Sequence, residues 1–301
     1  MKYYVPSDTS RILADNLEHC RNMRLILSRY LSEETVYNSD VENERNQKWR
    51  DKWLKEVIKC FSKEDSILKD LVELVEAELS RWLIMTEHAS RFELVNATRL
   101  VIGLGGKGAL EFGITLHHVT GLPFIPGSAL KGLARSYALL TLAEVRGVKA
   151  ESGALSQLDE ALSSPDAPHN EGSSEWHYRN AFGSQRTAGV CQFFDGVLSE
   201  FRSETLFTLD VMTPHFFKYY SDGGKSAPDD ADNPNPVSYM TVSAGNVFAF
   251  AIGLRRAANH KDNHATLKQA RQWLRAALQE MGVGSKTGSG YGYFVPLSQH
   301  E

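Results

Sequence analysis

The chain has 301 residues, of which 42% are hydrophobic, enough for one large domain or two modest ones. Its formal net charge of −4 differs from the basic balance of most stand-alone nucleic-acid binders, so any nucleic-acid surface has to be local. The sequence has no apolar run of about 18 residues, and Cys20, Cys60 and Cys191 form no C-x-x-C pair that would indicate a zinc site. We expect a soluble, cytoplasmic protein with reduced thiols, no metal, no cofactor and no membrane association.

Residues 1–90 are predicted to be helical. Apolar residues recur at helical spacing in three stretches, and the third is expected to begin at Ser62, with Asp65 three residues later in a capping-box pattern. Trp53 and Trp82 lie within these apolar stripes, which favours a place in the core over a functional role. We expect this region to be an N-terminal helical extension.

Residues 91–301 are predicted to alternate strands with helices. This order is typical of an α+β, ferredoxin-like sheet that carries insertions at 147–180 and 221–236. In chain order we expect strands at 91–102 and 109–118, a helix at 128–145, a polar loop-rich insertion at 147–180, strands at 190–198 and 205–212, a Pro, Gly and Asp-rich excursion at 221–236, a strand pair at 239–254, a helix at 266–281 and a last strand at 293–297.

The first glycine-rich segment, 103–108, formally matches the G-x-G-x-x-G pattern of dinucleotide-binding sites. Such a site needs a helix directly after the glycines, so that the helix N-terminus can hold a pyrophosphate. The next residues, 109–116, are strand-like instead, which argues against a dinucleotide. We predict a glycine turn between strands, where a phosphate can approach the backbone at Gly105, Gly106 and Lys107.

The second segment, 125–135, combines a Pro-Gly turn with the start of a predicted helix. Ser128 is expected to be the N-cap of this helix. The first helical turn presents unpaired N–H groups and a positive dipole end, and Lys131 and Arg135 lie on one face close to it. This arrangement is typical of phosphate binding. Taken alone, it is explained equally well by a capped helix with two solvated basic residues.

The third segment, 282–294, holds Lys286 and Thr287 among several glycines. Its spacing is not that of a Walker A loop, and Tyr291-Gly-Tyr-Phe matches an RNP1 motif only in part because the leading basic residue is missing. Glycines such as Gly284 leave backbone N–H groups accessible to phosphates, and Tyr291 could stack on a base. The alternative interpretation is a flexible hairpin.

Together these segments resemble the RAMP proteins of CRISPR systems. The resemblance rests on the glycine segment 103–108, on Thr-Gly-Leu-Pro-Phe-Ile-Pro-Gly-Ser-Ala-Leu-Lys-Gly-Leu-Ala-Arg at 120–135, and on Gly-Val-Gly-Ser-Lys-Thr-Gly-Ser-Gly-Tyr-Gly at 282–292. Between them, 181–184 and 189–195 are similar to a further shared RAMP motif. Each motif is weak alone, and the combination is specific.

A narrower resemblance points to the sixth-subunit family of type III-B Cmr complexes. It rests on Thr-Pro-His-Phe-Phe-Lys-Tyr-Tyr at 213–220 and Asn-Pro-Val-Ser-Tyr-Met-Thr-Val at 235–242. The whole resemblance covers about residues 91–296. One departure is Ala129, where members of the family usually repeat serine; the preceding Ser128 is expected to keep the cap.

The resemblance implies a ferredoxin-like (RRM-like) RAMP domain in an RNA-guided antiviral ribonucleoprotein. Such a subunit would bind the 3′ part of the guide crRNA and cap the filament of backbone subunits. Its implied partners are the crRNA, the target RNA and other Cmr subunits, namely the backbone RAMP, the head-end RAMP and the small helical subunit. The resemblance places Ser128, Lys131 and Arg135 in the contact with the guide backbone, beside the loops 105–107 and 284–287.

The resemblance also bears on catalysis. Backbone RAMP subunits cut target RNA with an aspartate between the first glycine cluster and the Pro-Gly-Ser motif, but residues 113–126 contain no Asp or Glu. We therefore predict a non-catalytic subunit. One alternative is a metal-independent guide-processing nuclease that uses His117, His118 or His215; the first two are expected on opposite faces of a strand. Another is an adaptor whose glycine loops contact only protein.

Overall fold

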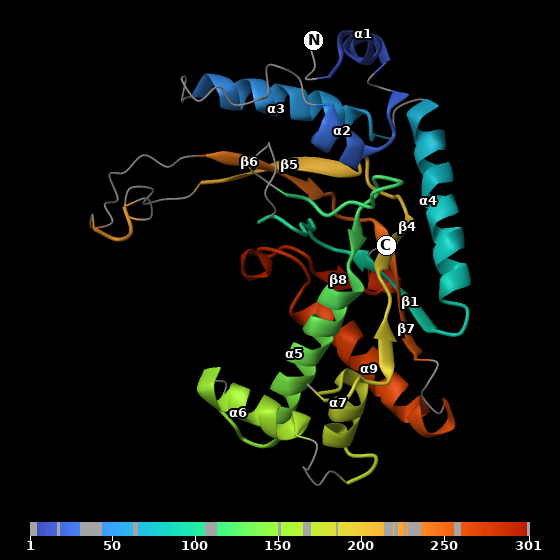
Figure 1. The fold of residues 1–301 in the computed structure, drawn as a ribbon, viewed down its shortest axis with the longest axis vertical. Helices are drawn as coiled ribbons and strands as arrows, with labels where there is room; N and C mark the ends of the chain where they lie inside the picture. The colour runs from blue at the N-terminus through green and yellow to red at the C-terminus, as the bar shows by residue number, and fades with distance from the viewer. Residues whose placement is uncertain are drawn as a thin grey trace. The chain divides into compact units, whose positions relative to one another are not determined.

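The computed structural model (Figure 1) forms two compact units, which we describe separately. Unit 1 comprises residues 1–71, 103–122 and 203–243, and unit 2 comprises 72–102, 123–202 and 244–301. No helix in the described ranges is both long and apolar enough to cross a membrane. The structure describes residues 5–16, 19–30, 44–62, 66–105, 113–149, 152–164, 170–184, 186–213, 219, 222–225, 227, 236–255 and 260–299.

Unit 2 contains a βαββαβ arrangement. Its elements in chain order are β1 (Ser90–Asn96), α5 (Gly127–Val145), β4 (Gly196–Glu200), β7 (Val247–Leu254), α9 (His260–Glu280) and β8 (Phe294–Val295). The strands lie in the order β4-β7-β1-β8 with antiparallel neighbours, and the short β2 (Phe124–Ile125) and β3 (Cys191–Phe193) pair with β4 and β7. This is the ferredoxin-like α+β sheet that the sequence predicted.

The central strand β7 is covered on both faces. Successive side chains of a strand point to opposite sides, so Phe248 and Phe250 lie on one face and Ala249 and Ala251 on the other. The phenylalanines pack against Phe294, whereas the two alanines pack with Trp82 of α4 (Ser66–Met85). A continuous buried run of this kind explains why β7 shows no apolar–polar alternation.

Helices α5 and α9 pack against each other through small and apolar residues. Leu130, Ala134, Ala138 and Leu142 recur every four residues along α5 and are buried, which gives a single apolar stripe. Alanines in such a stripe let a neighbouring helix approach closely. On α9, the guanidinium of Arg271 lies 5.3 Å from the ring centre of Phe92 in β1, so α9 covers the phenylalanine face of the sheet.

Unit 1 joins N-terminal helices to a two-stranded sheet. The helices are α1 (Ser7–Asn16), α2 (Met23–Arg29) and α3 (Glu44–Lys59), and the sheet pairs β5 (Phe207–Met212) with β6 (Val237–Val242). Phe61 contacts Phe207 edge to face, and Ser62 forms a bridge with Thr205. The structure gives α4 from Ser66, and residues 63–65 lie outside the described residues, so the expected helix start at Ser62 stays a prediction.

Three expectations differ from the structure. The insertion 147–180 is not mainly loop, since it contains α6 (Ser152–Ser163) and α7 (Ser174–Phe182). The expected strand pair at 239–254 is not a pair: β6 and β7 belong to different sheets. Residues 113–118 of the expected strand 109–118 form no regular strand, and residues 109–112 lie outside the described residues. Most of the expected excursion 221–236 also lies outside them. A domain boundary at residue 90 stays a prediction.

Candidate nucleic-acid interface

The start of α5 is held by a carboxylate from a distant segment. The helix begins at Gly127, whose N–H donates to Asp195 Oδ1 at 2.7 Å. No side chain fits at Gly127, because a Cβ there would overlap the carbonyl oxygen of Phe193. The expectation that Ser128 is the N-cap is wrong: the cap position is Pro126, and Ser128 is an exposed residue of the first turn. Asp195 supplies the missing acceptor.

This cap changes where a phosphate can bind. The positive end of the α5 dipole already faces the Asp195 carboxylate, which weakens its attraction for another anion. Asp195 is itself held, since its carbonyl accepts the indole N–H of Trp82 at 2.8 Å. The main candidate site therefore lies further along the helix, at Lys131 and Arg135, rather than at the N–H group of Gly127 that Asp195 already binds.

Lys131 and Arg135 line an open cleft of about 960 Å³ in unit 2. Helix α6 also lines the cleft, with Ser156, Glu160 and Ser163 among its residues. The segment after α7 completes the cleft with Arg186. The structure thus brings two of the predicted residues together with a third basic side chain that the sequence interpretation did not select.

Arg135 is largely engaged inside the protein. Its Nη2 donates to both carboxylate oxygens of Asp159, at 2.8 and 3.0 Å, and lies 3.3 Å from the hydroxyl of Ser163. Its Nε donates to the hydroxyl of Tyr178 at 3.0 Å. Among the described residues, none accepts a hydrogen bond from Nη1, so the guanidinium keeps one group for a ligand in the cleft.

Lys131 has a different environment. It is half-buried, and the described residues provide no hydrogen-bond acceptor or ion-pair partner for its ammonium. Burial lowers its pKa, and the nearby charges of Arg135 and Arg255 lower it further. Burial raises the pKa of the nearby Cys191 thiol to about 12, so this cysteine provides no counter-charge at neutral pH. Cations gathered in this way favour binding of an anion.

The glycine segment near the C-terminus is braced rather than a simple hairpin. Ser285 N–H donates to the carbonyl of Val101 at 2.7 Å, and Gly292 N–H donates to that of Arg99 at 2.8 Å. Gly284 has φ +98°, and a Cβ there would overlap the Val101 carbonyl oxygen. Lys286 adopts the left-handed backbone conformation directly before a 3-10 turn, η2 (Thr287–Ser289). A left-handed residue followed by right-handed ones points neighbouring backbone N–H groups in one direction.

The first glycine segment is described only in part. Gly103 has φ +81° and leaves room for Thr115, whose hydroxyl would lie 2.5 Å from a Cβ. Gly105 is exposed and has open space around it. Both residues belong to unit 1, whereas the cleft belongs to unit 2. Gly106 and Lys107 lie outside the described residues.

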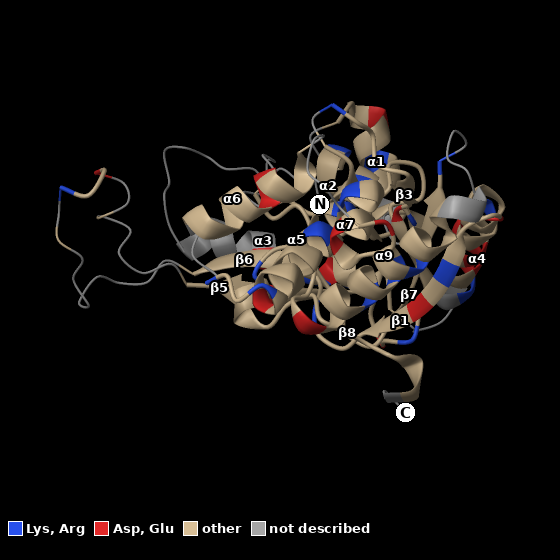
Figure 2. Cartoon of the chain, turned by 90° about the horizontal axis from the view of Figure 1, so that it is seen from below, with Lys and Arg blue, Asp and Glu red and all other residues tan. Residues whose placement is uncertain are grey.

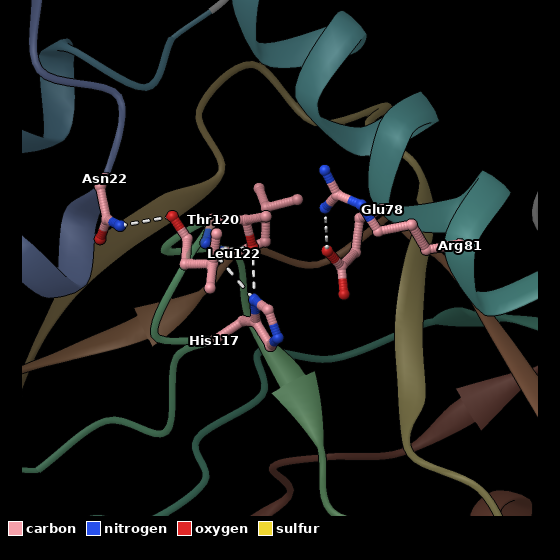
Figure 3. A network of polar contacts seen from close by, with 7 residues as sticks. Asn22, Glu78, Arg81, His117, Thr120 and Leu122 are labelled. Carbon is pink, nitrogen blue, oxygen red and sulfur yellow. Dashed lines mark hydrogen bonds and ion pairs between the residues drawn. The ribbon is translucent and has the colours of Figure 1, made fainter. Parts of the chain in front are cut away.

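His117 lies in a turn that Asn22, at the start of α2, contacts (Figure 3). His117 Nδ1 lies 3.1 Å from the hydroxyl of Thr120, and the ring centres of His117 and His118 are 4.9 Å apart. Asn22 donates to the carbonyl of Val119 at 2.8 Å while its Oδ1 accepts from the first turn of α2. The expectation of opposite faces is wrong, because the segment is a turn and not a strand. His215 lies outside the described residues.

Charge on α4 contrasts with that of the cleft. Figure 2 shows acidic and basic residues next to each other along this helix. Its acids outnumber its bases and are Asp70, Glu73, Glu76 and Glu78, against Lys69 and Arg81. This helix therefore offers no basic surface for a polyanion.

Two residues of the site could not be selected from the sequence. Asp195 lies in the 189–195 segment, but its contact with Gly127 spans 68 residues of chain. Arg186 lies in a polar loop with no pattern to distinguish it from other surface arginines. Within the described part of the chain, His, Cys, Asp and Glu side chains form no group of three or more that could hold a metal ion.

The profile of the RAMP superfamily matches residues 93–295. The chain is 31% identical over 238 residues to the CRISPR system Cmr subunit Cmr6 of Pyrococcus furiosus, a match that covers 69% of this chain and 68% of that protein. It is 28% identical over 169 residues to Cmr6 of Saccharolobus solfataricus, covering 55% of this chain and 45% of that protein.

A solved structure shares the fold. A chain in the cryo-EM structure of the type III-B Cmr-beta bound to cognate target RNA aligns with a TM-score of 0.53 and 19% identity. The alignment covers 95% of this chain and 84% of that chain. At this identity the likeness concerns the fold.

Proposed function

The chain belongs to the RAMP superfamily, and on that premise we propose that it is a non-catalytic subunit of a type III-B CRISPR effector. Its role is to bind the backbone of the guide crRNA in the cleft beside α5. The observation that carries this proposal is the clustering of Lys131, Arg135 and Arg186 in one open cleft. Contacts with phosphates supply most sequence-independent affinity for nucleic acid, and a local basic cleft provides them in a chain of negative net charge.

The assembly role is supported by the relatives. Two of them are named Cmr6, and the structure with the shared fold is a type III-B complex bound to target RNA. We propose that this chain joins the corresponding complex, holds the 3′ part of the crRNA and caps the filament of backbone subunits. Its partners are then the crRNA, the target RNA and other Cmr subunits.

Other predicted residues remain part of the proposal. Lys131 is the principal phosphate ligand, and Arg135 contributes its Nη1 group. Further contacts are assigned to Ser128 on the first turn of α5, to Gly284, Lys286, Thr287 and Tyr291 in the braced loop, and to Gly105, Gly106 and Lys107. The left-handed backbone at Lys286 supports the assignment, since this conformation is uncommon outside glycine and clusters at functional sites.

The absence of catalysis is proposed on the sequence of the 113–126 segment. It contains neither Asp nor Glu, so it lacks the carboxylate expected for target cleavage. In the described turn, His117 Nδ1 shares a hydrogen bond with the Thr120 hydroxyl. These features favour a positioning subunit over a nuclease.

The proposal is tested with Lys131→Glu. We expect the variant to bind single-stranded guide RNA about tenfold more weakly near 0.15 M salt, because reversal of one charge removes a phosphate contact and adds a repulsive one. Lys149→Glu is the matched control: Lys149 is an exposed lysine of the same unit that does not line the cleft. Fluorescence anisotropy measures both affinities.

The assembly is tested in the native host. Tagged protein should recover short RNAs that share a repeat-derived 5′ end, together with other Cmr subunits, and Lys131→Glu should recover less of this RNA. Recovery of the chain alone, or equal RNA binding by both lysine variants, would contradict the proposal.

A further inference from the structure

We propose that α6 forms part of the RNA site and is held in place by Arg135, and that Arg186 is an additional phosphate ligand in the same cleft as Lys131. This inference rests on the proposed function and deepens it. It assigns a role to the 147–180 segment, which the sequence presented only as a polar insertion. It also gives Arg135 a positioning role besides its contact through Nη1.

Helix α6 is attached by a three-residue network. The Asp159 carboxylate of α6 accepts hydrogen bonds from Arg135 of α5. It also accepts one from the hydroxyl of Tyr178 of α7, at 2.5 Å. The Tyr178 hydroxyl in turn accepts from Arg135 Nε. Each residue thus contacts both of the others, and the three belong to three different helices.

The network connects the buried Tyr178 to the partly exposed Arg135 and Asp159. The Tyr178 side chain is 0% exposed, whereas the Arg135 and Asp159 side chains are 40% and 33% exposed. Tyr178 packs against Phe182 and Trp273, so its ring is fixed by the core. An isolated ion pair at this exposure would contribute little. The shared buried hydroxyl gives this pair a defined geometry and sets the position of α6.

Arg186 belongs to a tight turn, of which Ser184 also lines the cleft. The hydroxyl of Ser184 accepts the backbone N–H groups of Arg186 and Thr187, at 3.2 and 3.1 Å. The turn is closed by Ser184 N–H, which donates to the Thr187 carbonyl at 2.8 Å. Gly183 has φ +78°, and a Cβ there would overlap the backbone of residues 187–189. The backbone of Arg186 is therefore ordered before any ligand binds.

The charges of the cleft distinguish the two acids of α6. Asp159 is paired with Arg135, so its charge is already balanced within the protein. Glu160 lines the same cleft, and no described residue forms an ion pair with it. Glu160 repels a polyanion, whereas Asp159 fixes the position of α6 through its ion pair with Arg135. The two adjacent carboxylates therefore have opposite expected effects on RNA affinity.

The first test compares Asp159→Asn with Glu160→Gln. Each substitution removes one negative charge from the cleft, so simple electrostatics predicts tighter RNA binding for both. We expect Glu160→Gln to bind RNA at least as tightly as the wild type. We expect Asp159→Asn to bind at least threefold more weakly, because α6 is no longer fixed. Equal tightening by both variants would overturn the positioning role of Arg135 and Asp159.

The second test measures Arg186→Gln. Loss of one phosphate contact to single-stranded RNA should reduce the slope of log affinity against log salt by about 0.7 and weaken binding about fourfold near 0.15 M salt. Arg81→Gln is the matched control, since Arg81 is an exposed arginine of unit 2 that does not line the cleft. An unchanged slope for Arg186→Gln would remove Arg186 from the site.

The outcomes separate this inference from the proposed function. If the wild type binds guide RNA and Lys131→Glu weakens it, the RNA site stands, and the α6 and Arg186 variants decide the inference alone. If the wild type does not bind guide RNA, the proposed function itself fails. Thermal unfolding of each variant identifies any loss of binding that is due to misfolding, and Arg186→Gln, an exposed substitution, remains informative where Asp159→Asn does not fold.

Discussion

At the scale of single residues, Gly284 and Gly288 lie in the same loop but in different surroundings. Gly284 has φ +98° and a carbonyl oxygen where a Cβ would stand, whereas Gly288 has open space and no positive φ. We expect Gly284→Ala to destabilise the protein by roughly 1–3 kcal/mol because of backbone strain. Gly288→Ala should stabilise it by roughly 0.4–1 kcal/mol, since it restricts the unfolded chain. Urea unfolding measures both; similar effects of the two variants would contradict the bracing of Gly284.

Another prediction at this scale concerns His177. It is 8% exposed, its Nδ1 lies 2.9 Å from the hydroxyl of Thr266, and burial lowers its pKa. The unfolded chain therefore takes up a proton at a higher pH than the folded one. The contribution of neutral, buried His177 to the free energy of unfolding is fully present above a pH of about 6.5, the ordinary histidine pKa. It is lost as the pH falls below that value.

The histidine effect is tested with His177→Gln. We expect the variant to lose about 1 kcal/mol of stability at pH 7.5, through the altered hydrogen bond, and to lose less further stability between pH 7 and pH 5 than the wild type. His118→Gln, which replaces an exposed histidine, controls for histidine loss in general. A pH dependence unchanged by His177→Gln would contradict the assignment. Urea unfolding at several pH values provides the measurement.

At the scale of elements, the start of α5 is stabilised by a side chain outside the helix. Asp195 Oδ1 accepts the first N–H group of the helix, which has no partner within the helix itself. We expect Asp195→Ala to destabilise the protein by roughly 0.5–2 kcal/mol, as loss of a cap does elsewhere. Asp195→Asn keeps an acceptor oxygen and should lose only the charge–dipole contribution, roughly 0.3–1 kcal/mol. Equal losses in thermal unfolding would show that the hydrogen bond is not the stabilising feature.

The helices of unit 2 also explain the location of the candidate site. α5 presents its buried stripe to α9 and its basic residues to α6. The same helix thus contributes both to the core and to the cleft, at neighbouring residues: Leu130 is buried and Lys131 lines the cleft. A substitution at Ala134 or Ala138 would disturb packing, whereas one at Lys131 changes mainly charge, which is why Lys131 is the sharper test of function.

At the scale of the whole molecule, the chain builds a βαββαβ sheet whose connections carry long segments. Residues 103–122 lie in sequence between β1 and α5, and residues 203–243 lie between β4 and β7; both group with the N-terminal helices in unit 1. The connections that a minimal ferredoxin-like fold keeps short are therefore the parts of this chain that form a second compact unit. The RAMP profile spans both units, because it runs through residues 93–295.

A prediction for the whole protein concerns catalysis. Incubated with target RNA, the protein should yield no cleavage products, because the 113–126 segment carries no carboxylate. Incubated with repeat RNA in the absence of divalent metal, it should also yield none, because the proposal gives no histidine a catalytic role. His117→Ala and His118→Ala should bind guide RNA and behave as the wild type does. Products that disappear in either histidine variant would favour the processing nuclease instead. Denaturing gel electrophoresis of end-labelled RNA resolves the two outcomes.

The sequence by itself determined the features that arise from local physics. The expected helices at 128–145 and 266–281 correspond to α5 and α9, and the second half of the expected strand pair at 239–254 corresponds to β7. The three glycine segments with their Pro-Gly-Ser turn indicated the family. Lys131 and Arg135 were selected because a spacing of four residues places them on one helical face. Both line the cleft, so this part of the candidate site could be predicted.

Only the tertiary structure decided the pairings between distant residues. The capping of Gly127 by Asp195, the network of Arg135, Asp159 and Tyr178, and the separation of β6 and β7 into different sheets join segments far apart in the chain. Periodicity and turn chemistry report on neighbours within a few residues, whereas these contacts depend on how whole elements pack. The sequence therefore indicated which side chains are basic and exposed, and the packing determined which of them share a cleft.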